Sequence, residues 1–327
     1  MIPASAGNTA ARPSVRICEM SPRDGLQALN PRRPVPIELK VKLIRALAQS
    51  GVAYIEVGAF VSPRAVPQMA DSSEVARAVA DLKGVQRAAL VPNLIYYDAF
   101  AASGCDTLAL FVSASESYSQ SNLRMSITEA FTAAQAVAER ARADGFRMRA
   151  HLSAAFESEP GKPSDVAAVV KLCQRLRAMG CEEVSLADTY GTASPARVRD
   201  VTGQVATAIG MDHVALHLHD TLGLGIASAM AARQIGVSKF DSSVGGIGGS
   251  PFSTTASGNI ATEELVCLLD SMGAVTGVDL AALARAGQIV RQITQHTGDP
   301  DPPSRALTYL ERRFLTPLAA PGQNTGL

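Results

Sequence analysis

The run His213-Val-Ala-Leu-His217-Leu-His219-Asp220-Thr221 alternates as a β-strand does and carries two histidines one residue apart. Because successive side chains of a strand point to opposite faces, both imidazoles are expected on the same face. A helical pattern, Gly225 to Ile235, follows the run. One strand and one helix in succession form the βα unit of a parallel sheet, and two converging imidazoles suggest a metal site.

Seven further strand-like runs along the chain give eight in total. The predicted strands are Val15–Met20, Tyr54–Phe60, Arg87–Pro92, Thr107–Ser113, Arg147–Ser153, Glu183–Thr189, Val214–Asp220 and Lys239–Val244. The predicted helices are Pro36–Ser50, Ser73–Leu82, Ile127–Asp144, Pro163–Met179, Pro195–Ile209, Gly225–Ile235 and, after the last strand, Leu280–Gln295. Pro195 stands at a first helical position after Ser194 as N-cap, and glycines follow several helices.

Eight βα repeats in one chain favour a closed (β/α)8 TIM barrel of the α/β class, with an additional C-terminal helix, over an open sheet. The length of 327 residues and a 47% hydrophobic composition suit one large domain. We predict a flexible N-terminal segment at 1–14, the barrel at 15–275, a helical extension at 276–298 and a Pro-rich tail at 299–327.

Composition disfavours several classes of function. Thirty basic and thirty acidic residues leave no net charge, which disfavours nucleic acid and anionic membranes as partners. The five cysteines are scattered without a C-x-x-C pair, so neither a disulfide framework nor a thiolate zinc site is indicated. No run approaches the length of a membrane span, and we expect a cytoplasmic protein.

Polar residues gather where the predicted strands end, which is where barrel enzymes build their active sites. They are Arg23 and Asp24 after the first strand, Glu56 in the second, Asp188 at the end of the sixth, His217 and His219 in the seventh, and Asn259 beyond the eighth. A hard cation, Mg²⁺ or Mn²⁺, accepts carboxylate, carbonyl and imidazole ligands. Asp24, His217, His219 and Asn259 meet that need, although an Asx-turn before Gly25 is an alternative for Asp24.

Arg23 offers a permanently charged donor fork to a carbonyl oxygen that gains negative charge as an enolate forms. The alternative is a salt bridge to Glu56, and both are compatible. The last predicted strand opens into Gly245, Gly246, Gly248 and Gly249. We interpret these glycines as a mobile loop, while tight barrel closure is the competing explanation.

Eight segments of the chain resemble the hydroxymethylglutaryl-CoA lyase family of metal-dependent barrel lyases. They are Ser-Pro-Arg-Asp-Gly-Leu-Gln at 21–27, Phe-Val-Ser-Pro at 60–63, Val-Pro-Gln-Met-Ala-Asp at 66–71, Val-Pro-Asn-Leu at 91–94, Leu-Ala-Asp-Thr at 186–189, His-Leu-His-Asp-Thr at 217–221, Asp-Ser-Ser-Val-Gly-Gly at 241–246 and Ala-Ser-Gly-Asn-Ile-Ala-Thr-Glu at 256–263. Asp220-Thr221 favours the lyases over the condensing synthases, which continue with Asn-Asp.

The resemblance implies cleavage of a 3-hydroxy-3-methylglutaryl-CoA-type thioester to acetyl-CoA and a β-keto acid such as acetoacetate. It implies that coenzyme A is part of the substrate and that the protein is a homo-oligomer, a dimer or larger. The implied catalytic residues are Arg23, Asp24, Glu56 and His217; the implied metal ligands are Asp24, His217, His219 and Asn259; the implied supporting residues are Gln27, Asp188 and Glu263.

The chain departs from the family where the enolate carbon must be protonated. The family places a cysteine after the two glycines of the loop, and here Ser250 follows Gly249. An alcohol is a far weaker acid than a thiol, so Ser250 needs a relay to donate. His151 stands where the family usually has a tyrosine, either as a different proton donor or in an ordinary hydrogen bond.

Three other functions compete with the lyase reaction on HMG-CoA. The first is a lyase or aldolase for a different hydroxyacyl-CoA, which the altered loops favour. The second is the reverse chemistry, a Claisen-type condensation, since the same site catalyses both directions. The third is a metal-binding barrel that lost catalysis together with its thiol. A Schiff-base aldolase is disfavoured, because no lysine follows a predicted strand.

Overall fold

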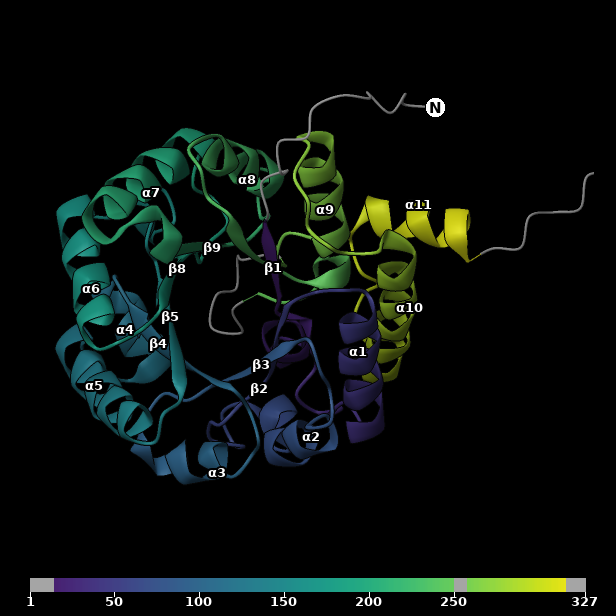
Figure 1. The fold of residues 1–327 in the computed structure, drawn as a ribbon, viewed down its shortest axis with the longest axis horizontal. Coiled ribbons are helices and arrows are strands. Elements are labelled where there is room, and N and C mark those ends of the chain that lie inside the picture. Colours follow the sequence, from purple (N-terminus) through teal and green to yellow (C-terminus); the bar gives the residue numbers. More distant parts are fainter. Residues whose placement is uncertain (1–14, 250–257, 316–327) are drawn as a thin grey trace, which may run out of the picture.

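The computed structural model describes residues 15–249 and 258–315, and within them eight parallel strands close into a barrel (Figure 1). The order around the barrel is β1 (Arg16–Glu19), β2 (Tyr54–Ala59), β3 (Gln86–Leu90), β4 (Thr107–Ser113), β5 (Arg147–Ser153), β8 (Glu183–Asp188), β9 (Val214–Leu218) and β10 (Lys239–Ser242). β10 pairs with β1 in parallel and completes the circle. All eight predicted strands are confirmed: β4 and β5 have the predicted bounds, and the bounds of the other six differ from the prediction by one or two residues at one or both ends.

Helices surround the barrel on its outside (Figure 1). They are α1 (Ile37–Gln49), α2 (Ser72–Ala78), α3 (Tyr97–Ala101), α4 (Glu116–Leu123), α5 (Ile127–Ala143), α6 (Val166–Ala178), α7 (Pro195–Ile209), α8 (Gly225–Gln234) and α9 (Thr262–Ser271). Their ends follow local chemistry. Ser194 caps α7 through the Arg197 N–H with Pro195 in the first turn, as predicted, and Ser126 forms a capping box with Glu129 at α5.

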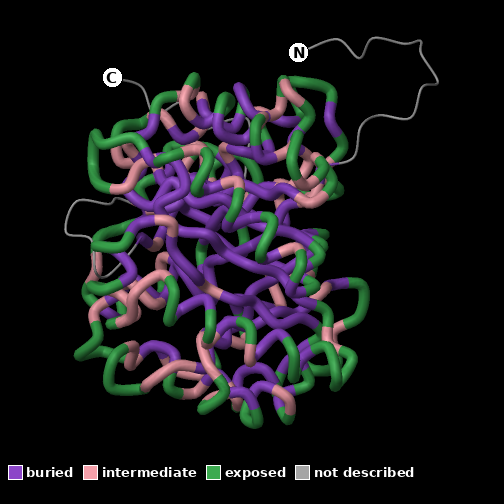
Figure 2. Tube along the Cα trace, turned by 90° about the vertical axis from the view of Figure 1, so that its left-hand side faces the viewer, coloured by how far each residue is buried: buried purple, intermediate pink, exposed green. Residues whose placement is uncertain are grey.

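Two kinds of core hold the barrel. Apolar side chains such as Leu110, Phe131 and Leu186 fill the layer between strands and helices, and Figure 2 shows the buried trace concentrated there and in the strands. The inside of the barrel is charged instead. Arg149 is fully buried, pairs with Glu183 and Asp241, and lies 5.0 Å over the ring of Tyr54. The cost of burying this guanidinium is offset because carboxylates surround it.

The structure adds elements that the sequence analysis did not predict. A short hairpin, β6 (Glu157–Glu159) and β7 (Lys162–Pro163), follows β5, and α4 lies between β4 and α5. The sequence of α4 has no apolar stripe of helical period. Ser115 caps the helix, and the side chain of Tyr118 is buried. Tertiary packing rather than intrinsic propensity therefore stabilises this helix.

The C-terminal part is more ordered than predicted. α10 (Leu280–Thr297) is the expected additional helix, and it packs along α1. The predicted Pro-rich tail at 299–327 contains a second helix, α11 (Arg305–Phe314), which buries Leu307 and Leu310. Gly287 of α10 lies so close to Leu307 that a Cβ there would meet its Cδ1 at 2.2 Å. Residues 1–14 and 316–327 of the predicted flexible ends lie outside the described part.

No helix in the described residues combines the length and the apolar character that crossing a membrane requires.

Candidate active site

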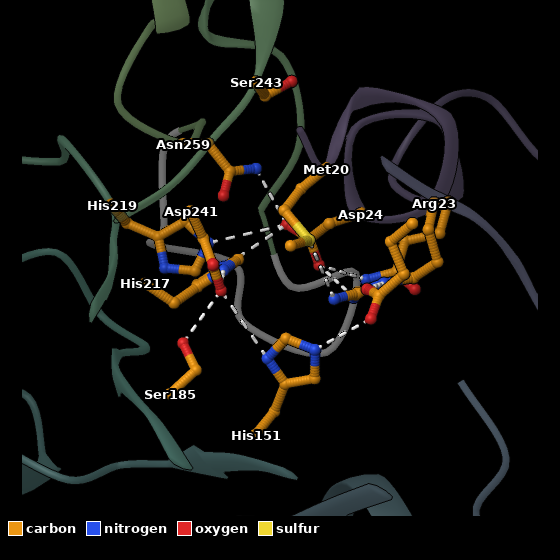
Figure 3. Close-up of polar contacts among 12 residues, drawn as sticks. Met20, Arg23, Asp24, His151, Ser185, His217, His219, Asp241, Ser243 and Asn259 are labelled. Atoms are coloured by element: carbon orange, nitrogen blue, oxygen red, sulfur yellow. Dashed lines mark hydrogen bonds and ion pairs between the residues drawn. The ribbon is translucent and has the colours of Figure 1, made fainter. Parts of the chain in front are cut away.

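Barrel closure gathers the predicted polar residues at one end of the strands (Figure 3). Asp24 follows β1 in a single π-helical turn, Ser21–Gly25, whose five residues are all buried. Its carboxylate faces the histidines: Oδ2 lies 3.7 Å from Nε2 of His217 and 3.8 Å from Nε2 of His219. The three side chains thus form a buried cluster with ligand atoms within 4.8 Å of one another. The residues predicted as metal ligands from β1 and β9 are brought together.

The partners of Asp24 are side chains of the site. Oδ1 accepts from Arg23 Nη1 at 2.6 Å and from Gln27 Nε2 at 2.7 Å, and Oδ2 accepts from Asn259 Nδ2 at 2.8 Å. An Asx-turn therefore does not account for Asp24. Burial alone would raise the pKa of this carboxyl, but Arg23 and the two histidines hold the pKa well below its usual range. Asp24 is consequently ionised at neutral pH.

In each of His217 and His219, Nδ1 is hydrogen-bonded and Nε2 points toward the cluster. His217 Nδ1 donates to Asp241 Oδ2 at 3.2 Å, and His219 Nδ1 donates to the Asp188 carbonyl at 2.8 Å. Because both acceptors are oxygens without protons, the neutral rings carry their lone pair on Nε2. Burial lowers the pKa of His217. Although burial opposes the shift, Asp24 raises the pKa of His219. In their neutral form both rings direct the Nε2 lone pair at the cluster, as ligands require.

Two buried polar atoms at this cluster have no hydrogen-bond partner within residues 15–249 and 258–315, which tests whether a metal ion fits. They are Nε2 of His219 and Oδ1 of Asn259. A buried polar atom without a partner is costly unless something else satisfies it. Asn259 donates its amide hydrogens to Asp24 and to the Ile247 carbonyl, so its oxygen remains free. One carboxylate, two imidazoles and one amide oxygen fit a divalent cation that retains open positions for substrate.

Arg23 forms the predicted salt bridge to Glu56, and its enolate-stabilising role stays a prediction. Its Nε donates to Glu56, and its Nη1 donates to Asp24, with the guanidinium almost fully buried. Although burial opposes the shift, Arg23 lowers the pKa of Glu56 to about 2. Nη2 has a weaker neighbour, the Met20 sulfur at 4.0 Å. Glu56 and Asp24 therefore orient the Arg23 guanidinium and leave Nη2 with only the weak contact to the Met20 sulfur.

Asp241 lies in the Asp-Ser-Ser-Val-Gly-Gly motif at 241–246, was assigned no role from sequence, and contacts the candidate site. Its carboxylate is fully buried and accepts from Arg149. It also accepts from Ser185 Oγ at 2.8 Å and from His217 (Figure 3). Burial opposes ionisation, yet Arg149 and His217 lower the pKa of Asp241. The sequence contained a sign of this role. An acidic residue at an inward position of a short buried strand requires a cationic or hydrogen-bonding partner.

His151 lies between two carboxylates. Its Nε2 is 2.9 Å from Glu56 Oε1, and its Nδ1 is 3.7 Å from Asp241 Oδ2. The ring centroid is 6.0 Å from that of His217. His151 therefore links the Arg23–Glu56 pair to the Asp241–His217 pair, next to the metal cluster and outside its ligand set.

The three supporting residues contribute in different ways. Gln27 contacts Asp24 directly. Asp188 gives its backbone carbonyl to His219, while its carboxylate accepts the N–H groups of Gly191 and Ala193; burial raises the pKa of that carboxyl to about 6. Glu263 accepts the Gly245 N–H, and burial raises its pKa to about 7.

The glycines after β10 meet close neighbours. Gly245 has φ +76°, and a Cβ there would meet Pro302 at 2.8 Å; Gly248 has φ +114°, and its Cβ would meet the Asn259 amide at 2.4 Å. Close packing at the closure of the barrel therefore explains the glycines at 245 and 248, and mobility of the loop stays a prediction. Ser250 lies outside the described residues, so its predicted role stays a prediction as well.

A cavity of about 680 Å³ opens onto the cluster. Arg23, Asp24, His151, His217 and His219 line its inner end. None of the five cysteines lines it. Burial raises the pKa of the Cys18 thiol, the third residue of β1, to about 12. The described cavity walls thus offer acid and base groups but no thiol.

Comparisons with known proteins agree with this geometry. A family model described as HMGL-like matches residues 14–290. Hydroxymethylglutaryl-CoA lyase of Pseudomonas mevalonii is 43% identical over 274 residues, which cover 84% of this chain and 90% of that protein. A 3-hydroxy-3-isohexenylglutaryl-CoA/hydroxymethylglutaryl-CoA lyase of Pseudomonas aeruginosa is 40% identical, covering 84% and 91%. The solved hydroxymethylglutaryl-CoA lyase of Pseudomonas aeruginosa superposes with a TM-score of 0.86 at 38% identity, covering 92% of this chain and 99% of that one.

Replacing Asp241 by Asn is expected to weaken Mn²⁺ binding by about 10- to 100-fold, because the amide no longer provides the negative charge that holds the His217 N–H. Isothermal titration calorimetry of the purified variant measures the affinity. Asp212→Asn, at an exposed position at the other end of β9, is the matched control. An unchanged affinity in the Asp241 variant would contradict the positioning role.

Glu263 makes stability depend on pH. Its folded pKa of about 7 lies above the unfolded value of about 4.3, so its contribution is fully present below about pH 4 and is lost as the pH rises through 7. Glu263→Gln should remove that loss, which is on the order of 3 kcal/mol. Urea unfolding at pH 5 and pH 8 with a chelator present measures it, with half-buried Glu264→Gln as control. Equal pH dependence in the Glu263 variant and wild type would refute this assignment.

Proposed function

The chain belongs to the HMGL-like family, and on that premise we propose that it cleaves 3-hydroxy-3-methylglutaryl-CoA to acetyl-CoA and acetoacetate. It is a carbon–carbon lyase with a TIM-barrel fold and a CoA thioester as substrate. One observation supports the proposal most strongly: Arg23 and Asp24 are joined by an ion pair, and Asp24 faces both histidines across the barrel mouth. An anion-stabilising donor therefore adjoins a cation site.

Asp24, His217, His219 and the Asn259 oxygen would hold the cation, which we propose is Mg²⁺ or Mn²⁺. Asp24 suits a ligand better than a base, because its pKa lies well below its usual range. When bound, the cation supplies Lewis acidity that lowers the pKa of the substrate's tertiary hydroxyl. This set of hard oxygen and imidazole donors favours these ions over thiolate-binding metals.

Cleavage breaks the bond between C2 and C3 of the acyl group. The hydroxyl proton passes to His151, the cavity imidazole outside the proposed ligand set, C3 becomes the ketone of acetoacetate, and the electron pair passes to C2 and the thioester oxygen. Nη2 of Arg23 is the donor we assign to that oxygen, since Nε and Nη1 are occupied by Glu56 and Asp24. A donor held in place before charge develops stabilises the transition state without reorganisation.

Protonation of C2 completes acetyl-CoA. Of the three histidines that line the cavity, His151 is the one outside the proposed metal set. Its Nε2 adjoins Glu56, which lies against Arg23, so a proton held there is close to the enolate that Arg23 stabilises. We assign His151 the proton transfer, with Ser250 as the competing donor. A homo-oligomer and a cytoplasmic location stay predictions.

Purified protein with Mn²⁺ is expected to release acetyl-CoA from 3-hydroxy-3-methylglutaryl-CoA, and a chelator should abolish the release. Arg23→Gln should lower kcat by about 10²- to 10³-fold while Mn²⁺ still binds, because the variant loses an oxyanion donor and no ligand. His219→Ala should lose Mn²⁺ binding and activity together.

The two variants separate the roles of the site. Retained activity in His219→Ala would falsify the metal assignment, and loss of Mn²⁺ binding in Arg23→Gln would show that Arg23 serves the ligands rather than the enolate. Wild-type protein that binds Mn²⁺ but releases no acetyl-CoA would support a non-catalytic barrel instead.

A further inference from the structure

The connection between α10 and α11, residues 299–304, contacts both ends of the barrel sequence, and we call it the C-terminal strap. Its first residue is fixed to the loop after β1, where the Asn30 N–H donates to Asp299 Oδ2 at 2.9 Å. Its last residue lies on the turn after β10, where the Ser304 N–H donates to the Gly245 carbonyl at 3.4 Å. The strap therefore joins the first and the last loop of the barrel, beside the pairing of β1 with β10.

Close packing fixes the strap on the turn after β10, η5 (Val244–Gly246), more firmly than this long hydrogen bond does. Pro302 is buried, and a Cβ at Gly245 would lie 2.8 Å from the Pro302 Cβ. Because Gly245 has no side chain, the proline ring reaches its backbone. The Gly245 N–H in turn donates to the Glu263 carboxylate. Pro302 and Glu263 therefore both hold η5 at this one residue.

The η5 turn contacts the residue that precedes Asn259, a proposed metal ligand. A Cβ at Gly258 would lie 1.7 Å from the Gly246 carbonyl oxygen, so the two backbones are in direct contact. The next side chain, Asn259, donates its amide to Asp24 at 2.8 Å. A displacement of Gly246 would therefore change the support of Gly258 and, with it, the position of the Asn259 amide.

Arg291 of α10 holds the strap and α11 together. Its Nε donates to both oxygens of Glu311 at 3.0 Å, and its Nη2 donates to Thr308 Oγ1 at 3.0 Å. Its Nη1 lies 3.5 Å from Asp301 Oδ2 in the strap. A guanidinium with partners on both segments fixes the strap relative to α10.

We propose that the C-terminal strap positions Asn259 for the metal ion, with Pro302 as the positioning residue that contacts η5. Neither Pro302 nor Arg291 is among the described residues that line the cavity, so both act through the backbone of η5. The inference rests on the proposed metal site and adds a remote support to it. Loss of the Pro302 contact should weaken Mn²⁺ binding by about tenfold, the lower end of the range for groups that orient metal ligands.

The first test measures the Mn²⁺ dissociation constant of the full-length protein by isothermal titration calorimetry. Pro302→Ala should raise the constant by about tenfold. Pro300→Ala, the same substitution at an exposed position of the strap, should leave it unchanged. Arg291→Gln releases the strap without altering the buried proline and should also raise the constant, whereas Arg285→Gln, at an exposed position of α10, should not. An unchanged constant in Pro302→Ala would overturn the proposal.

Hydrogen–deuterium exchange of the metal-free protein separates positioning from a general loss of stability. Pro302→Ala should speed exchange in peptides that contain Gly245 and Ile260, whose N–H groups donate to Glu263 and to the Leu218 carbonyl. Peptides from β4 and β5 should exchange as in wild type. Equal acceleration throughout the barrel would assign the strap to stability alone and overturn the proposal. Wild-type protein that binds no Mn²⁺ would refute the proposed metal site instead.

Discussion

The parallel pairing of β1 with β10 is the constraint on which the site depends. Arg16, Ile17, Cys18 and Glu19 align with Lys239 through Ser242, and this register joins the beginning of the barrel to its end. Only in the closed barrel does the turn after β1 meet the segment after β10. The hydrogen bond between Asn259 and Asp24 spans 235 residues of sequence. A shift of this register would separate the two halves of the ligand set while leaving each βα unit intact.

The balance of buried charges explains why the site favours binding of a cation. Three buried carboxylates, Asp24, Glu56 and Asp241, have pKa values lowered by neighbouring cationic groups and are ionised at neutral pH. Two buried guanidinium groups, Arg23 and Arg149, face them. Among these five groups, negative charges exceed positive charges by one when the histidines are neutral. A divalent ion beside Asp24 offsets that excess and satisfies the unpartnered atoms of His219 and Asn259.

Much of this arrangement was predictable from sequence because it follows from periodicity. The two-residue period placed His217 and His219 on one face, and eight βα repeats placed Arg23, Asp24 and Glu56 at the same end of the barrel. Asp241 was missed because its role depends on which inward side chains of non-adjacent strands meet. α4 and α11 were missed because packing against the fold stabilises them. Asp188 was placed correctly in the strand, but its carboxylate caps a loop and its carbonyl serves His219.

We propose that His217 in β9 and His219, just after this strand, both ligate a metal ion beside Asp24. Pulsed electron paramagnetic resonance of the Mn²⁺-loaded protein tests it directly, because the spectrum records ¹⁴N nuclei bound to the ion. Coupling to two imidazole nitrogens is expected, with one remaining when either His217 or His219 is replaced by Gln. A spectrum without directly bound nitrogen, unchanged by either replacement, would contradict it.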